Sequence, residues 1–330
     1  MGSLFSLFVV IVLILMAVAG IKVANMQFFF GVVLPYAAVI IFILGVIGKA
    51  LKWGRSPVPF KIPTTCGQQK SLPWIRQNKL DNPSSALGVI GRMLLEVLLF
   101  RSLFGNTTVE LKEGPKLAHG STKWLWLGGL AFHWSFLVVL LRHTRLFMDP
   151  PPAFLQKIEV MDGFLQIGLP GLFISGVVLL AAATYLFLRR VFIPQVRYIS
   201  LPADYFPLFL IIAIAVSGIL MRYFIKVDVV SIKGLTLGLF SLNASVPEGI
   251  GVLFYVHLFL VSILLAYIPF SKLMHFGGVF LSPTRNLAND SRVKRHINPW
   301  NYPVKLHTYE EYEDEFRDKM KEAGLPLDKE

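Results

Sequence analysis

The segment "AFHWSFLVVLLRHTRLF" (residues 131–147) is apolar enough to lie in a membrane, yet it carries two histidines, His133 and His143. An imidazole is costly to place in lipid or in tight packing unless it has a partner. The segment "YVHLFLVSILLAYIPFSKLMHFGG" (residues 255–278) has the same character and carries His257 and His275. The architecture around these four histidines therefore depends on what each ring contacts.

Composition places both segments in a membrane protein. Apolar residues make up 55% of the chain and charged residues 16%, against about 25% charged residues in an ordinary soluble domain. Six apolar stretches approach the ~20 residues that a helix needs to cross a bilayer. They are predicted near residues 4–24, 28–48, 124–146, 165–188, 205–225 and 250–271. The expected fold class is all-α, a polytopic membrane helix bundle.

The distribution of basic residues predicts the orientation. Segment 49–123 holds twelve Lys or Arg against four acidic residues, and the tail from Lys272 onward is also rich in basic residues. Loops 142–164 and 226–249 carry fewer. Because basic loops stay on the cytoplasmic side, both termini are expected there, in a multi-pass protein of the cell inner (cytoplasmic) membrane. Contact with anionic lipid explains the net charge of +12, so no nucleic acid partner is inferred.

One further segment, "SALGVIGRMLLEVLLFRSLF" (residues 85–104), is long enough to span but is interrupted by Arg92, Glu96 and Arg101. Arg92 and Glu96 are four residues apart, so they share a helix face and can pair. We expect an amphipathic helix in the cytoplasmic interface or on a partner subunit. A seventh crossing is the alternative.

The N-terminal segment, the single cysteine and a capping box near the C-terminus each give a separate prediction. The N-terminal segment has an apolar core like a cleaved signal but lacks a basic region before it, so a retained anchor is expected. The single cysteine, Cys66, excludes a disulfide or an iron–sulfur cluster held by this chain alone. It is an inert cysteine, a redox thiol or one ligand of a shared cofactor. Thr308 and Glu311 form a capping box that predicts a surface helix over residues 308–324.

The four histidines are expected to form two pairs. The third and sixth spans run in opposite directions, which brings His133 towards His275 near the cytoplasmic surface and His143 towards His257 near the outer one. A bis-histidine pair between facing helices matches the two axial positions of haem. Without a C-x-x-C-H motif, the prediction is two non-covalently bound haem b groups.

The vertical spacing of the histidines requires a bend in the sixth span. Ten residues rise ~15 Å along a helix and eighteen rise ~27 Å, so straight helices would not match both pairs. Pro269 is expected to kink the chain before His275. A histidine-bearing transporter or a membrane anchor is the alternative class. A proton-coupled transporter would favour intramembrane carboxylates and internal repeats, and the predicted span centres and the sequence offer neither.

Two motifs carry a family resemblance. Phe132-His133 to His143 follows an F-H-x9-H pattern, and Pro269 to His275 follows P-F-[ST]-[KR]-L-x-H. From about residue 120 to 280, the chain resembles the gamma subunit of respiratory nitrate reductase, a membrane cytochrome b. The resemblance implies the same two haem pairs. It also implies a quinol that is oxidised near the outer haem and electrons that pass inward to an iron–sulfur subunit.

The N-terminal part departs from nitrate reductase. Its two spans and the loop "GRSPVPFKIPTTCGQQKSLPWI" (residues 54–75) resemble the M subunit of the Dsr complex of dissimilatory sulfite reduction. That resemblance implies menaquinone, a cytoplasmic iron–sulfur partner like heterodisulfide reductase, periplasmic multihaem cytochrome c and iron–sulfur subunits, and a second membrane subunit. A nitrate-reductase-like or sibling redox complex is the alternative. The quinone-site lysine of the family is not evident at the matching point, Met161-Asp162-Gly163.

Three cations next to the histidines are candidate contacts of haem propionates or a quinone head group: Arg142, Arg145 and Lys272. The alternative is that they are ordinary interfacial cations. No catalytic residue is predicted, because the chain is expected to be an electron-transfer subunit of a quinol-linked oxidoreductase complex. The expected division is 1–50 (two spans), 51–120 (cytoplasmic loop and amphipathic helix), 121–280 (cytochrome b domain) and 281–330 (cytoplasmic tail with a short helix).

Overall fold

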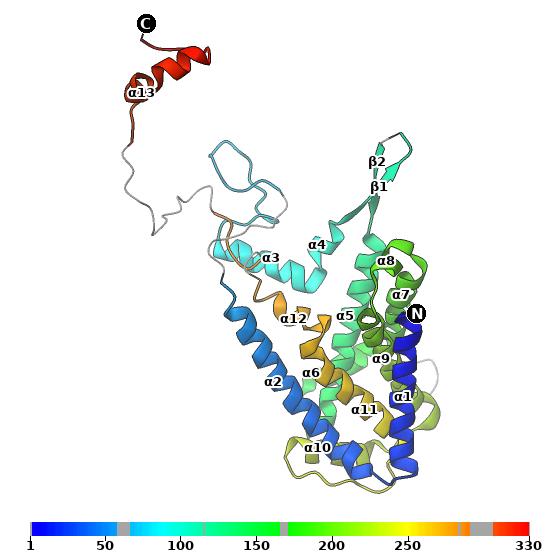
Figure 1. Ribbon diagram of the computed structural model, residues 1–330. Coiled ribbons are helices and arrows are strands. Elements are labelled where there is room, and N and C mark those ends of the chain that lie inside the picture. The colour runs from blue at the N-terminus through cyan, green and yellow to red at the C-terminus, as the bar shows by residue number, and fades with distance from the viewer. Residues whose placement is uncertain are drawn as a thin grey trace.

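The computed structural model describes residues 2–57, 67–114, 116–165, 171–282, 285–290 and 306–329. Within these ranges, six helices are long and apolar enough to cross a membrane (Figure 1). Each is either one α-helix or an α-helix continued by a short π or 3-10 turn. They are α1 (Gly2–Lys22), η1 and α2 (Phe29–Val33, Leu34–Gly54), α5 and η2 (Lys123–His143, Thr144–Phe147), α7 (Ile174–Phe192), α9 and η3 (Pro202–Ile219, Leu220–Ile225), and α11 and η4 (Val252–Tyr267, Ile268–Phe270). The predicted all-α polytopic bundle is confirmed.

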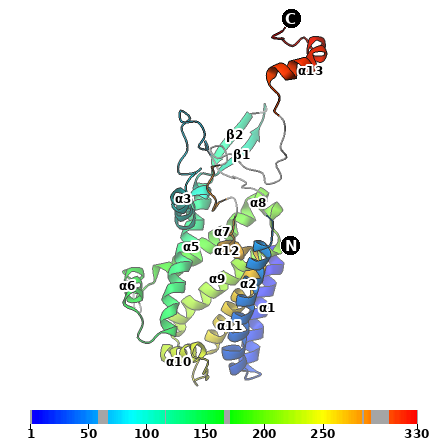
Figure 2. The same ribbon diagram turned by 90° about the vertical axis from the view of Figure 1, so that its left-hand side faces the viewer.

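Short elements lie between and after the spans. They are α3 (Ala86–Leu99), α4 (Arg101–Phe104), β1 (Thr107–Lys112), β2 (Lys116–Ser121), α6 (Ala153–Asp162), α8 (Pro194–Ile199), α10 (Val229–Phe240), η5 (Lys272–Met274), α12 (His275–Gly278) and α13 (Tyr309–Glu322). The N-terminus, α3 and the β1–β2 hairpin lie towards one end of the bundle, and α10 lies at the other (Figures 1 and 2). The antiparallel hairpin and α10 were not predicted.

The interrupted segment 85–104 forms two short helices instead of a span. Helix α3 has 14 residues, about 21 Å of rise against a hydrocarbon core of about 30 Å. It ends at Phe100, whose φ of 50° takes the chain out of the helix. Glu96 pairs with Arg285 at 2.6 Å, which ties α3 to the segment after the last span. The helix lies across the ends of the spans (Figure 1), as expected of an interfacial helix.

The fourth span begins later than predicted. Its helix, α7, starts at Ile174 instead of residue 165, and α6 is a separate helix before it; residues 166–170 lie outside the described ranges. The Asp162 side chain at the end of α6 accepts hydrogen bonds from the Ser175 backbone N (2.7 Å) and Oγ (2.6 Å). These bonds satisfy free donors at the start of α7, and thereby position its first turn.

The sixth span is the centre of the bundle. Helix α11 packs against α1, α2 and α9, whereas α5 packs chiefly on α7. The buried side chains of Tyr255, Phe259 and Leu260 contribute to the core from α11. The two histidine-bearing helices, α5 and α11, therefore owe their positions to other helices instead of packing closely on each other.

Pro269 does more than kink this span. The α-helix ends at Tyr267, continues as two 3-10 turns, η4 and η5, and resumes at His275 as α12. Proline lacks the amide proton that an α-helix needs at this point. His275 therefore lies on a separate short helix, so the eighteen-residue spacing from His257 no longer fixes its height.

The C-terminal prediction is confirmed as well. Thr308 accepts a hydrogen bond from the Glu311 backbone N at 3.2 Å, and the Glu311 carboxylate accepts one from the Thr308 backbone N at 3.1 Å. This reciprocal capping box begins α13. Cys66, in contrast, lies outside the described residues.

Candidate functional site

The structure brings His133 of α5 and His275 of α12 together. Their ring centroids lie 5.8 Å apart and the ring planes make an angle of 86°. Phe100 and Phe132 contact the His133 ring edge-on, with centroids 4.9 and 5.1 Å from it. The predicted pair of His133 and His275 is thus present, with two phenylalanine rings against His133.

The other two histidines form the second predicted pair. The rings of His143, at the end of α5, and His257, on α11, have centroids 6.4 Å apart and planes within 16° of parallel. One pair has nearly perpendicular imidazoles and the other has nearly parallel ones. The two sites therefore differ in ligand orientation.

These separations suit two nitrogen ligands on opposite sides of one metal ion. A metal–nitrogen bond of about 2 Å on each side, and about 1 Å from each nitrogen to its ring centre, place the two ring centres about 6 Å apart. Two imidazoles that only pack against each other, or that share a hydrogen bond, have no reason to keep their ring centres about 6 Å apart in both pairs. Among the described residues, no group of three or more His, Cys, Asp or Glu could hold a metal ion. Two axial ligands to a macrocyclic metal complex fit this donor set best.

Hydrogen bonds leave the same nitrogen free on all four rings. In each histidine, Nδ1 is bonded to another group of the chain. The partners are the Gly129 carbonyl for His133 (2.8 Å), the Val139 carbonyl for His143 (2.7 Å), the Lys272 carbonyl for His275 (2.9 Å) and Ser217 Oγ for His257 (2.8 Å). Because a carbonyl can only accept, Nδ1 carries the proton in the first three rings, and Nε2 has the free lone pair that a metal needs.

His257 obtains the same tautomer through a serine. Ser217 Oγ donates to the Ile214 carbonyl at 2.9 Å, so its lone pair accepts the Nδ1 proton of His257. The imidazole also packs against the neighbouring Gly218, where a Cβ would lie 3.4 Å from His257 Cε1. Sequence reasoning missed Ser217, which is forty residues from the ring that it orients.

A Ser217→Ala protein is expected to bind a metal complex at the His143–His257 pair about 10- to 100-fold more weakly, the usual effect of losing the group that orients a ligating histidine. Retention of each cofactor during dialysis against a haem scavenger would measure this. Ser262→Ala is the matched control, because Ser262 Oγ bonds only its own helix, at the Leu258 carbonyl (2.8 Å). Equal loss in both variants would contradict an orienting role for Ser217.

A network of charged residues lies at the C-terminal end of α5. Arg142 pairs with Asp162 and donates to Ser175 Oγ at 3.0 Å. The Phe173 ring lies between two guanidinium groups, with Arg142 Cζ 3.4 Å and Arg222 Cζ 3.7 Å from its centroid. Cation–π contact stabilises both cations. The network links α5 to α6, α7 and η3, next to His143.

The other two predicted contact residues also have carboxylate partners. Arg145 pairs with Glu159, and Lys272 pairs with Asp204 at 2.6 Å. Asp204 is 5% exposed and Lys272 is 73% exposed, so the lysine also reaches solvent. All three cations stay beside the histidines, but each is partly neutralised within the chain.

Comparison with known proteins identifies relatives of this chain. Residues 119–296 match the model of the family described as "Nitrate reductase gamma subunit". A "Hdr-like menaquinol oxidoreductase cytochrome b-like subunit" of Archaeoglobus fulgidus is 47% identical over 278 residues, covering 82% of this chain and 83% of the relative. Its counterpart in Archaeoglobus profundus is 44% identical over 81% of each chain. The "Nitrate reductase gamma chain" of Bacillus subtilis is 29% identical over 56% of this chain and 82% of its own length.

Proposed function

The chain belongs to the nitrate reductase gamma subunit family of membrane cytochrome b electron-transfer subunits, and on that premise we propose that it binds two haem b groups. His133 and His275 are the ligands of the inner haem, and His143 and His257 are those of the outer one. The observation that carries this assignment is the hydrogen bonding of all four Nδ1 atoms. It leaves four Nε2 lone pairs in two facing sets.

The chain's own part is to bind and orient these ligands. Haem, when bound, supplies reversible one-electron chemistry. The carbonyl and hydroxyl partners of Nδ1 hold each imidazole in one tautomer and one orientation. Phe100 and Phe132 lie edge-on against the His133 ring and shield part of it from water. The first pair lies at the middle of α5 and the second at its end, and together they form a path for electrons across the membrane.

The proposed electron donor is menaquinol, near the outer pair. The names of the two Archaeoglobus relatives, both menaquinol oxidoreductase subunits, support this choice. Arg142 and Arg145 are the proposed contacts for haem propionates or the quinol head group at this end, and Lys272 has the same proposed role at the inner end. The quinone-site lysine of the family is not evident at the matching point, Met161-Asp162-Gly163, and the charged groups there are those of the Arg142–Asp162 pair.

The proposed electron acceptor is a cytoplasmic iron–sulfur subunit like heterodisulfide reductase. The distribution of Lys and Arg along the chain supports an orientation in which both termini, α3 and the hairpin lie in the cytoplasm. The proposed location is the inner membrane of the cell. In the proposed four-part division of the chain, with boundaries at residues 50, 120 and 280, residues 51–120 and 281–330 are the parts that dock on partner subunits. Periplasmic multihaem cytochrome c and iron–sulfur subunits and a second membrane subunit complete the proposed sulfite-reduction complex. A nitrate-reductase-like sibling complex is the second candidate, and co-purified partners distinguish the two.

A reduced-minus-oxidised visible spectrum of the purified chain, with a pyridine haemochrome count, tests the haem assignment. We expect two b-type haems per chain. A well-folded preparation without haem would overturn the proposal and favour a transporter or an anchor. A single haem would show that one of the two pairs does not ligate.

A further inference from the structure

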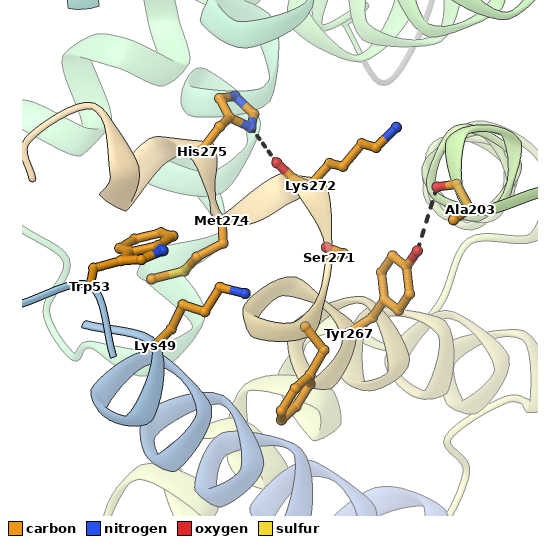
Figure 3. Close-up of a pocket in the computed structure, with 9 residues that line it drawn as sticks. Lys49, Trp53, Ala203, Tyr267, Ser271, Lys272, Met274 and His275 are labelled. Carbon is orange, nitrogen blue, oxygen red and sulfur yellow. Dashed lines mark hydrogen bonds between the residues drawn. The ribbon is translucent and has the colours of Figure 1, made fainter. Parts of the chain in front are cut away.

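A cavity of about 520 Å³ lies beside His275, where the end of α2 faces η4 and η5 (Figure 3). His275 also lines it, with its ring pointing away from Trp53 and Lys49 in this view. Its lining is mainly aromatic and apolar with two lysines: Lys49, Trp53, Tyr267, Phe270, Lys272 and Met274.

Helix α2 builds one wall of this cavity with residues four apart on a single face. Gly45 permits close approach to η4, because a Cβ there would lie 2.6 Å from Pro269 Cβ. Lys49 and Trp53 follow at the next two turns. The indole of Trp53 lies against the backbone after His275, where a Cβ at Gly278 would be 3.5 Å from the ring. Gly45 thus allows α2 to place Lys49 and Trp53 beside the inner ligand.

The two lysines of the cavity differ in their charge balance. Lys272 is neutralised by Asp204, at 2.6 Å. Lys49 Nζ lies 5.9 Å from the centroid of Trp53, and it has no carboxylate partner among the residues that the structure describes. The cavity therefore offers one uncompensated ammonium group, which can donate three hydrogen bonds, above an aromatic wall.

We propose that this cavity binds a planar ring with carbonyl oxygens, the head group of a quinone, on the inner side of the protein. A carbonyl oxygen accepts a hydrogen bond from Lys49 Nζ, and Trp53 provides a flat surface on which the ring stacks. This site is additional to the outer quinol site, and it rests on the proposed assignment of His275 to the inner haem. A phospholipid phosphate is a poorer match, because one free cation on a mostly apolar surface does not balance a phosphate as a bidentate arginine would.

The surface of α2 suits a ligand that arrives from the lipid. Ile40, Leu44, Ile47 and Leu51 are exposed on the side of the helix opposite Lys49 and Trp53, so α2 faces lipid there. On the cavity side, the lining residue Phe270 is 70% exposed, so the cavity opens on an apolar surface along which an isoprenoid tail can remain in the bilayer. Helix α2 precedes residues 119–296, the segment that matches the family. The cavity therefore combines the family's inner histidine with a helix from outside that segment.

The test uses the full chain in a His143→Ala background, which leaves the inner haem as the only signal, and a hydroxyquinoline N-oxide as the quinone-site probe. We expect the probe to shift the absorption and electron paramagnetic resonance spectra of the inner haem. Adding Lys49→Ala or Trp53→Ala should weaken this binding by about tenfold or more, as for the loss of one charged hydrogen bond or one stacking contact. Lys52→Ala, on an exposed side of the same helix, should leave it unchanged.

Other results of these experiments distinguish a failure of the inner quinone site from a failure of the haem assignment. No response of the inner haem to the probe overturns the inner site, as does equal weakening by Lys52→Ala. Displacement of the probe by phosphatidylglycerol vesicles, but not by a short-chain naphthoquinone, would identify a lipid site instead. If the His143→Ala protein binds one haem per chain, the proposed function stands whatever the probe does. If neither that protein nor the wild type binds haem, the haem assignment itself is contradicted. If His143→Ala does not fold, quenching of probe fluorescence in wild type, Lys49→Ala and Lys52→Ala proteins gives the same comparison.

Discussion

A His257→Ala protein is expected to bind one haem b per chain instead of two, and to lose the outer one. The ring of His257 lies 6.4 Å from that of His143 and is far from the inner pair along α11. Removing one axial nitrogen leaves an open position on a haem that has no other ligand to replace it, since no third metal-binding side chain joins the pair among the described residues. A pyridine haemochrome count and the remaining redox potential measure the loss.

The four single variants form a test of pairing. His143→Ala should reproduce the spectrum of His257→Ala, and His133→Ala and His275→Ala should lose the other haem together. His119→Ala is the matched control, because His119 lies on the β1–β2 hairpin outside the spans and should leave both haems in place. If His257→Ala and His275→Ala lost the same haem, the pairing would be wrong.

An Asp162→Ala protein is expected to be destabilised by about 3–5 kcal/mol, the usual cost of removing one partner from a buried ion pair. Asp162 is 7% exposed and Arg142 is 13% exposed. Without the carboxylate, Arg142 and Arg222 face each other across Phe173, Arg142 loses its ion-pair partner, and α7 also loses the acceptor for its Ser175 donors. Thermal unfolding in detergent, followed by circular dichroism, measures the effect.

Glu159→Ala provides the comparison on the same helix. Its partner is Arg145, and the two side chains are 31% and 34% exposed. A solvent-exposed pair contributes only about 0–1 kcal/mol, so this variant should unfold close to the wild-type temperature. Similar destabilisation in both variants would contradict the special role of the Asp162 network.

Local sequence patterns were enough to predict much of this molecule. Six apolar runs specified six spans, because length and hydrophobicity alone decide whether a helix can cross a bilayer. The ends of α13 followed from Thr308 and Glu311, which contact each other within one turn. The histidine pairs followed from antiparallel spans, together with a proline that predicted a break before His275.

Features that depend on distant contacts could not be predicted in this way. The start of α7 depends on Asp162, thirteen residues before Ser175. The charges in segment 85–104 predicted an interfacial helix, but not its break at Phe100, where the backbone is left-handed, nor the contact between Glu96 and Arg285. The hairpin has little burial pattern of its own, so its sequence gives no strong signal.

The sequence by itself determined which helices cross the membrane and which four histidines face one another, because hydrophobic length and helical spacing are local properties. Three of the rings are also held locally, by carbonyls three or four residues earlier in the chain. Only the tertiary structure decided how the fourth ring is held and what lies beside His275. Ser217 reaches His257 from another helix, and Trp53 packs beside His275 because Gly45 allows α2 to approach Pro269. Such contacts arise from the packing of separate spans, and no pattern within one span encodes the position of its neighbour.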